Sequence, residues 1–299
     1  MAFSCDDDVR ALCPCGRGWP ARQRGSGEGK TAARLSSVVA AQRQLLPQGA
    51  KGRARPLLET PIIQAFLVLF VLTLLQSGAH AIVGKSADGA QWQHHVVMVL
   101  SRSGTYAGFC SGVVLTRKII LTAAHCVSGA NDARAYVPGQ PLLALRRIAR
   151  HPDFHADAPR TRSRSIDLAL IETADALPSE FTAPALAGAQ RYEAGTSFEI
   201  AGFGVGREND AKTSGALRTG RVTLRAPLSS VLLWLDDPQH RTGACTGDSG
   251  GPVFTEDGKL AAIIAFAEGE GTRHCGKLTQ AVMIAPQREW IEGSIAGWQ

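Results

Sequence analysis

A serine framed by glycines has the strongest chemical signature in this sequence. It lies in the stretch Thr246-Gly247-Asp248-Ser249-Gly250-Gly251-Pro252. A nucleophilic serine needs a hydroxyl that stands clear of the backbone and small neighbours that let a substrate carbonyl approach. In such a turn the N–H groups of Gly247 and Ser249 can converge on one point, as an oxyanion hole requires. A plain Gly-rich turn between two strands is the alternative, and it would be preferred if no other segment supplied a base.

Two other segments supply a base and an acid. His125 ends a run of small and apolar residues and precedes Cys126, while Asp167 heads the apolar segment 168–171. A serine hydroxyl is a weak nucleophile without an adjacent base, so His125 is the candidate base for Ser249. Each residue alone also fits a structural role, as a core histidine, a cap at a strand start or a turn residue. Their joint occurrence favours catalysis.

These motifs, in the order His, Asp, Ser, resemble the signatures of the chymotrypsin/trypsin family of serine endopeptidases. A fourth motif, Ile82-Val83-Gly84-Lys85, is similar to the N-terminus that these enzymes expose on activation. The resemblance covers 82–299 and is closest to compact, bacterial-type members. It implies that Asp167 orients the imidazole of His125 and that the enzyme needs no cofactor.

The acid next to the nucleophile has a separate role. The carboxylate of Asp248 would disturb the site unless it pointed inward and met a cation. The resemblance implies that this cation is the free α-amino group of Ile82. Cleavage of the chain before Ile82 is therefore an expected condition of activity, because a stranded buried charge typically costs about 3–5 kcal/mol.

The resemblance also identifies a primary specificity pocket. Trypsins carry an aspartate six residues before the serine, where this sequence has Gly243. One wall reads Ala265-Phe266-Ala267 and the opposite wall is Thr279. These residues predict a neutral pocket for small or medium apolar side chains. Glu268 and Glu270 flank its entrance and leave recruitment of a basic residue as the alternative.

Charge is unevenly distributed along the chain. Residues 1–60 carry 10 Lys/Arg against 5 Asp/Glu and residues 61–81 carry none, which leaves 22 basic and 21 acidic residues from 82 onward. Residues 1–60 therefore account for +5 of the net charge of +6. A nucleic-acid-binding function is rejected on this ground.

Seven cysteines divide in the same way, with Cys5, Cys13 and Cys15 upstream and Cys110, Cys126, Cys245 and Cys275 in the body. Four cysteines permit three pairings. No pair has the short Cys-x₂₋₄-Cys spacing of a structural zinc site, so we expect no metal. The resemblance implies the pairs Cys110–Cys126 and Cys245–Cys275. Disulfides form in oxidising compartments and so predict export.

The N-terminal segment reads as an extension and a signal peptide. Residues 1–60 show no lasting apolar periodicity and predict a disordered basic extension, unless translation starts downstream of Met1. Residues 61–81 hold an apolar core and the small-x-small pattern Ala79-His80-Ala81, typical of a cleaved signal peptide. Cleavage after Ala81 is favoured over cleavage after Ala79. The apolar run of about 14 residues is short of the ~20 that a membrane anchor needs, although a membrane-tethered protease is the alternative.

From Ile82 onward short strands alternate with Gly-rich turns, a pattern typical of all-β barrels or sandwiches. The expected strands cover residues 96–100, 108–114, 118–121, 142–148, 167–171, 198–203, 217–224, 231–235, 251–254 and 260–266. The resemblance implies two antiparallel six-stranded β-barrels, about 82–182 and about 183–285, with a C-terminal α-helix over 286–296. We expect a monomeric, secreted or periplasmic serine endopeptidase with polypeptide substrates, protein protease inhibitors as a further class of partner, and no stable membrane association after signal cleavage. A catalytically inactive homologue that binds or adheres is the alternative function.

Overall fold

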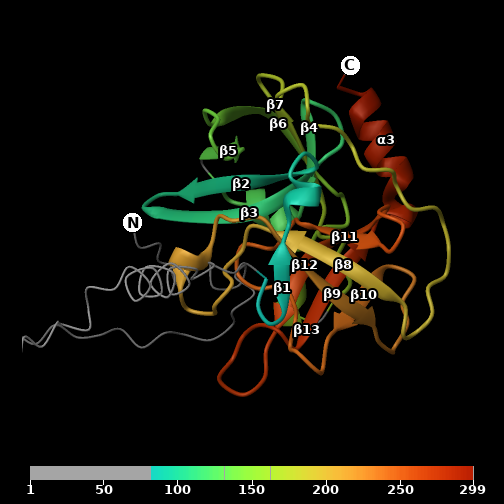
Figure 1. Cartoon of the computed structure of the whole chain (residues 1–299). Helices are drawn as coiled ribbons and strands as arrows, with labels where there is room; N and C mark the ends of the chain where they lie inside the picture. Colours follow the sequence, from blue (N-terminus) through green and yellow to red (C-terminus); the bar gives the residue numbers. More distant parts are fainter. Residues whose placement is uncertain (1–81, 131, 162, 299) are drawn as a thin grey trace, which may run out of the picture. The chain divides into compact units, whose positions relative to one another are not determined.

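The computed structural model describes residues 82–298 apart from 131 and 162 (Figure 1). The expected N-terminal extension, the signal peptide and the three upstream cysteines lie outside these residues.

The first barrel closes six antiparallel strands in the order β2-β3-β4-β7-β6-β5. They are β2 (Val96–Ser103), β3 (Tyr106–Val114), β4 (Ile119–Thr122), β5 (Asp132–Tyr136), β6 (Leu143–Arg150) and β7 (Ala169–Thr173). Exposure alternates along β5 and β6, as in strands with one face toward water, whereas β4 and β7 are buried on both faces.

The second barrel is formed by β9-β10-β13-β12-β11-β8 and closes through the pairing of β8 with β9. Its strands are β8 (Ser197–Gly202), β9 (Arg218–Leu224), β10 (Leu232–Asp236), β11 (Pro252–Thr255), β12 (Leu260–Glu268) and β13 (Leu278–Met283). The expected architecture of two six-stranded antiparallel barrels is confirmed.

Both faces of β4 and β7 are buried because a shared core joins the barrels. Leu121 and Leu170 of the first barrel pack in one cluster with Phe254 and Ile263 of the second. Burial of such side chains contributes roughly 1.5–3 kcal/mol each. The two strand ends that lead to His125 and Asp167 are thus anchored on the interface between the barrels.

The first barrel was expected to begin at about residue 82, but the first described segment of the chain pairs with the second barrel. Strand β1 (Ser86–Asp88) pairs with β9, and Val83 forms a bridge with Gly243. Residues 83–88 therefore belong to the second barrel, although the first barrel follows them directly in sequence. The short strands β5 and β13 were not anticipated either.

The C-terminal helix α3 (Arg288–Ala296) follows the 3₁₀ turn η6 (Ala285–Gln287) and lies beside the first barrel (Figure 1). Its buried Ile291 joins the core between the barrels, and Trp290 lies 4.8 Å from the ring of His151. The helix thus returns from the second barrel to pack on the first. Among the described residues, no helix combines the length and the apolar character needed to cross a membrane.

Candidate active site

The histidine and the aspartate meet at the end of the first barrel. His125 lies in the 3₁₀ turn η4 (Ala124–Val127), just after β4, and Asp167 lies just before β7, which pairs with β4. The Nδ1 atom of His125 is 2.6 Å from Oδ2 of Asp167, and its backbone N–H donates to Oδ1 at 2.9 Å. One carboxylate therefore fixes both the ring and the backbone of His125. With Nδ1 donating, the neutral ring keeps Nε2 as the acceptor that a general base needs.

Burial by itself lowers the pKa of His125, but the charge of Asp167 and the hydrogen bond to it outweigh burial and hold the pKa above its usual value. The imidazolium form is therefore stabilised by a carboxylate in direct contact. This is the electrostatic arrangement that a base requires when it accepts a proton in the reaction.

Ser249 is brought to the histidine by contacts of its backbone. Its carbonyl accepts from the N–H of Ser111 at 2.8 Å and lies 3.8 Å from Sγ of Cys126, whose Sγ is 3.7 Å from Nε2 of His125. Within the described part of the chain, Oγ of Ser249 has no hydrogen-bond partner, so the bond from Ser249 to His125 is not formed in this structure. Such catalytic bonds are often long without substrate and tighten in the complex.

The turn around the serine presents the two N–H groups of Gly247 and Ser249. Gly247 has a φ of +97°, and a Cβ at this position would lie 2.0 Å from the Phe109 ring. Only glycine therefore fits. Among the described residues, no protein group accepts from the N–H of Gly247 or Ser249. Two free donors on either side of Asp248 match the composition of an oxyanion hole.

Asp248 points away from the solvent into a cradle of backbone. It is fully buried, and its two carboxylate oxygens accept from the N–H groups of Gly204 and Cys245, each at 2.9 Å. Burial raises the pKa of Asp248 to about 7, although the two N–H donors act in the opposite direction. Within the described residues, no cation forms an ion pair with this carboxylate. The cradle thus holds a buried acid whose charged form has no counterion among residues 82–298 as the structure describes them.

The segment that begins at Ile82 is tied to the pocket region. Ile82 is fully buried, with Ala244 in the same apolar cluster. The carbonyl of the next residue, Val83, accepts from the N–H of Gly243 at 3.2 Å. The structure thus places the segment expected to supply an α-amino group against the segment that leads to Asp248.

The expected pocket residues gather beside the serine turn. The carbonyl of Ile264 accepts from Gly250 N–H at 2.7 Å, which attaches β12 and its residues Ala265, Phe266 and Ala267 to that turn. Across the sheet Ala267 pairs with Thr279, whose buried Oγ1 accepts from the N–H of Ala244 at 2.9 Å. These wall residues are all uncharged.

The floor of this region has little room. A Cβ at Gly243 would lie 3.1 Å from Cα of Gly276 and 3.3 Å from Oγ1 of Thr279. At the entrance, Glu270 pairs with Arg241 at 3.2 Å, both more than half exposed. An exposed pair of this kind is worth about 0–1 kcal/mol, so Glu270 remains weakly held.

Two disulfides fasten the loops around the site. Cys110 is bonded to Cys126 and Cys245 to Cys275, the same pairs that the resemblance implies. The first joins β3 to the turn that carries His125. The second joins the segment before Ser249 to the loop between β12 and β13. One disulfide therefore restrains the turn that carries His125, and the other restrains the segment that leads to Ser249.

Sequence reasoning missed two buried hydroxyl residues near the serine turn. Ser111 on β3 contacts both Gly247 and Ser249, and Thr122 donates to the Ser111 carbonyl at 2.7 Å. The only sequence signal was the position of Ser111 next to Cys110. Contacts across more than 130 residues leave no local pattern to recognise.

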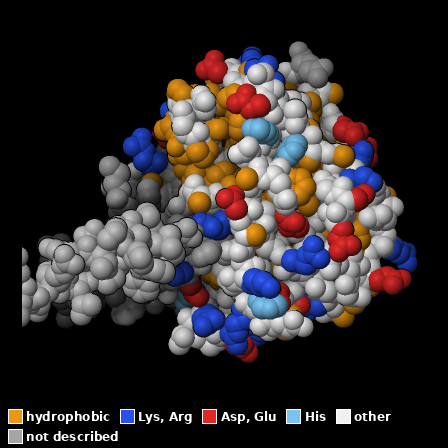
Figure 2. Space-filling view, viewed as in Figure 1, with side chains coloured by type: hydrophobic (Ala, Val, Ile, Leu, Met, Phe, Trp, Pro, Cys, Tyr) orange, Lys and Arg blue, Asp and Glu red, His pale blue; other side chains and the backbone are white. Residues whose placement is uncertain are grey.

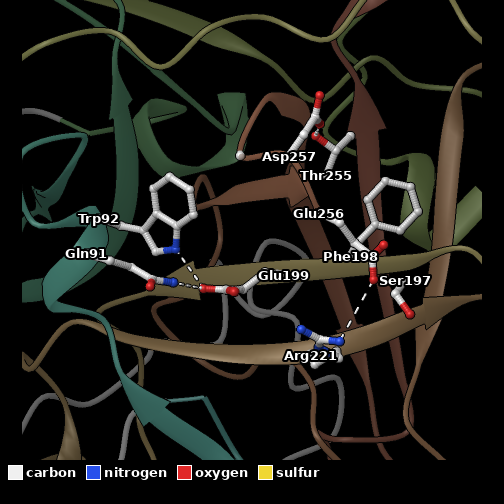
Figure 3. A pocket seen from close by; sticks show the side chains of 10 residues that line it. Gln91, Trp92, Ser197, Phe198, Glu199, Arg221, Thr255, Glu256 and Asp257 are labelled. Atoms are coloured by element: carbon white, nitrogen blue, oxygen red, sulfur yellow. Dashed lines mark hydrogen bonds and ion pairs between the residues drawn. The ribbon is translucent and has the colours of Figure 1, made fainter.

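A separate hollow of about 480 Å³ lies on the second barrel and contains none of the expected site residues (Figure 3). In it, Trp92 Nε1 and Gln91 Nε2 both donate to Oε1 of Glu199, at 2.7 and 2.5 Å. Arg221 and Glu256 face each other at 3.9 Å and are mostly exposed. The polar groups of this hollow thus pair with one another. The bonds to Glu199 attach the turn at Gln91 and Trp92 to β8.

The molecular surface shows no gathering of one charge on the face seen in Figure 2, where acidic and basic side chains are interspersed. Exposed pairs such as Arg160 with Asp157 and Arg207 with Asp210 illustrate the mixture.

Two closed barrels with a histidine, an aspartate in contact with it and a glycine-framed serine between them define the class of chymotrypsin-like serine hydrolases. A family model described as "Trypsin" matches residues 81–291, well over half of the sequence. The chain belongs to the trypsin family of serine endopeptidases.

Curated relatives agree with this assignment at modest identity. The chain is 24% identical over 256 residues to serine protease Hayan of Drosophila melanogaster, covering 72% of this chain and 39% of that protein. It is 27% identical to trypsin eta of Drosophila melanogaster, covering 70% and 88%. It is likewise 27% identical to granzyme M of Rattus norvegicus, covering 69% and 86%.

A solved structure shares the fold. It is the crystal structure of an inactivated protease paralogue of the scabies mite, with a TM-score of 0.58 and 19% identity, covering 72% of this chain and 99% of that one. At this identity the likeness concerns the fold alone.

Proposed function

We propose that this protein is an exported serine endopeptidase that hydrolyses peptide bonds through Ser249, His125 and Asp167. The observation that carries the proposal is the double contact of Asp167 with His125, at 2.6 and 2.9 Å. A histidine with only a packing role would not require a single carboxylate that bonds both its ring and its backbone N–H. It would also not require a glycine-framed serine nearby.

In the proposed reaction, Oγ of Ser249 attacks the carbonyl carbon of the scissile bond while its proton passes to Nε2 of His125. The N–H groups of Gly247 and Ser249 stabilise the oxyanion that forms. The C–N bond then breaks, and the leaving amine takes the proton from His125. Water, activated by the same histidine, attacks the acyl carbon and releases the acid with Ser249 restored.

A fluorophosphonate probe provides the direct test. Labelling of Ser249, with no labelling after heat denaturation, is the expected result, because only an activated serine reacts. An unlabelled, folded protein would instead support the alternative of an inactive homologue that acts by binding.

Specificity is proposed to be for small or medium apolar residues before the cleaved bond. The uncharged walls support this. Gly243 also supports it, since position 243 carries no carboxylate that could pair with a basic substrate side chain. Peptide amide substrates with Ala, Val, Leu or Phe at this position should be cleaved at least about tenfold faster than those with Arg or Lys, as a missing or mismatched contact is worth about 1–3 kcal/mol. Comparing kcat/KM over such a series is the measurement.

The control for specificity uses the two acidic residues at the entrance. Glu268→Gln and Glu270→Gln should leave the apolar preference unchanged. A native preference for Arg that is lost in either variant would assign specificity to that carboxylate instead. Gly243→Asp should raise the Arg preference only slightly, because a Cβ there meets Gly276 and Thr279 within 3.3 Å.

Activation is proposed to coincide with export. Signal cleavage after Ala81 would expose the α-amino group of Ile82, the counterion that Asp248 lacks within the described residues. The protein exported by a host without other proteases should therefore be active and begin with Ile82-Val83-Gly84, as shown by N-terminal sequencing and intact mass. An inactive, stable product that begins at His80 would replace this proposal with a dipeptide propeptide.

A further inference from the structure

Ser111 occupies a junction that the catalytic scheme does not use. This fully buried residue of β3 belongs to the first barrel, yet most of its polar atoms bond to the second half of the chain. Its N–H donates to the carbonyl of Ser249 at 2.8 Å, and its Oγ donates to the carbonyl of Gly247 at 2.9 Å. The two residues expected to form the oxyanion hole are therefore both bonded to one serine.

The hydroxyl of Ser111 is also an acceptor. It accepts from the N–H of Phe203 at 3.0 Å, while the next N–H, of Gly204, donates to Asp248. The carbonyl of Ser111 is occupied by Thr122. Every hydrogen-bonding group of Ser111 is thus satisfied, and its side chain connects the loop after β8 to the turn that carries the nucleophile.

We propose that Ser111 is a positioning residue that holds Gly247 in the orientation needed to stabilise the oxyanion. Gly247 has φ near +97°, and its carbonyl orientation depends on the bond from Oγ of Ser111. Loss of this bond leaves the carbonyl buried without a donor, so the glycine-rich turn, which has little intrinsic preference for one conformation, can relax. The N–H of Gly247 belongs to the preceding peptide, whose Thr246 carbonyl accepts from the N–H of Val205 at 2.9 Å. Relaxation of the peptide on the other side of Gly247 shifts this N–H relative to the reacting oxygen.

This inference rests on the proposed role of Ser249 as nucleophile. It predicts a defect in transition-state stabilisation rather than in substrate binding. Ser111→Ala should lower kcat about 10- to 100-fold with KM changed less than about threefold, which is less than the 10²–10³ for loss of an oxyanion donor. Affinity for a peptide aldehyde should fall by a similar factor, because Ser249 adds to the aldehyde carbon and its oxygen then occupies the oxyanion hole.

The matched control is Thr173→Val. Thr173 is also fully buried, lies in the same barrel, and its Oγ1 donates to the carbonyl of Asp175 at 2.7 Å, away from the serine turn. Both variants should lose stability in denaturant unfolding, but only Ser111→Ala should lose kcat and aldehyde affinity. Ser111→Thr, which retains the hydroxyl, should recover most of the kcat.

The outcomes separate the two proposals. Wild-type protein that neither hydrolyses peptides nor accepts a fluorophosphonate would refute the proposed function itself. Active wild type with a folded Ser111→Ala variant of unchanged kcat would overturn the positioning role. Equal losses of kcat in Ser111→Ala and Thr173→Val would also overturn it, because the effect would then follow from stability alone.

Discussion

Ser249→Ala and His125→Ala are each expected to reduce kcat for peptide hydrolysis by a factor on the order of a millionfold, the scale set by the convergent triad of subtilisin. Without Oγ of Ser249 no acyl-enzyme can form. Without His125 the serine has no general base to remove the proton of its hydroxyl. The measurement is kcat on a fluorogenic peptide, with active sites counted by titration in the wild type.

Both variants should remain folded. Ser249 has no hydrogen bond from Oγ within the described part of the chain, so its removal leaves no buried partner unsatisfied. His125→Ala leaves Asp167 without its ring partner, and a small loss of stability is expected. Double substitution should be no worse than either single change, because residues that act as a unit are not additive. More than a tenth of wild-type activity in either single variant would refute the assignment.

The all-β class could be predicted from local signals in the sequence, whereas the arrangement as two six-stranded barrels followed from the resemblance to the family. Short apolar segments separated by glycine-rich turns indicated the main strands, such as 96–100 and 260–266. β5 was missed because Asp132–Tyr136 alternates alanine with charged residues and carries little apolar signal. β13 was missed because Leu278–Met283 includes Thr279 and Gln280 within a short run. Both are recognised as strands only by their partners across the barrel.

The candidate site likewise has residues that the local sequence identifies and contacts that only the folded structure reveals. His125, Asp167 and Ser249 stand in distinctive local contexts, so they can be recognised from the amino-acid sequence alone. The bonds from Ser111 to Gly247 and from Gly243 to Val83 join residues more than 130 positions apart. Their partners follow from tertiary packing, and no periodicity or spacing in the sequence encodes them. The segment 83–88 was assigned to the first barrel for this reason.

The requirement for a free amino group at Ile82 should appear as a second large effect. A chain that begins at Ile82 is expected to exceed one that retains Ala81 by on the order of a hundredfold or more in kcat/KM, because stranding one charge of a buried pair costs about 3–5 kcal/mol. Activity of both forms, each verified by intact mass, is the measurement. Asp248→Asn provides the matched control.

In Asp248→Asn the two forms should have equal, low activity, because no carboxylate remains for the amino group to pair with. Such coupling between the two changes identifies the pair itself rather than two separate defects. A form retaining Ala81 that is as active as the form beginning at Ile82 would contradict the pairing.

Stability should fall with rising pH in both forms, but over different pH ranges. In the chain retaining Ala81, the pKa of Asp248 is raised to about 7 by burial, so the folded state binds this proton more tightly than the unfolded state. Stability should fall by about 4 kcal/mol as pH rises from about 4 through 7, at ~1.4 kcal/mol per pKa unit. Asp248→Asn should remove this decline.

In the chain beginning at Ile82, the carboxylate of Asp248 raises the pKa of the Ile82 amino group above ~8. The stabilisation from this pair is then complete below pH ~8 and is lost as pH rises through the folded pKa. Denaturant unfolding of both forms in a Ser249→Ala background, which prevents self-cleavage, measures the two profiles; profiles that coincide from pH 4 to 10 would contradict the ion pair.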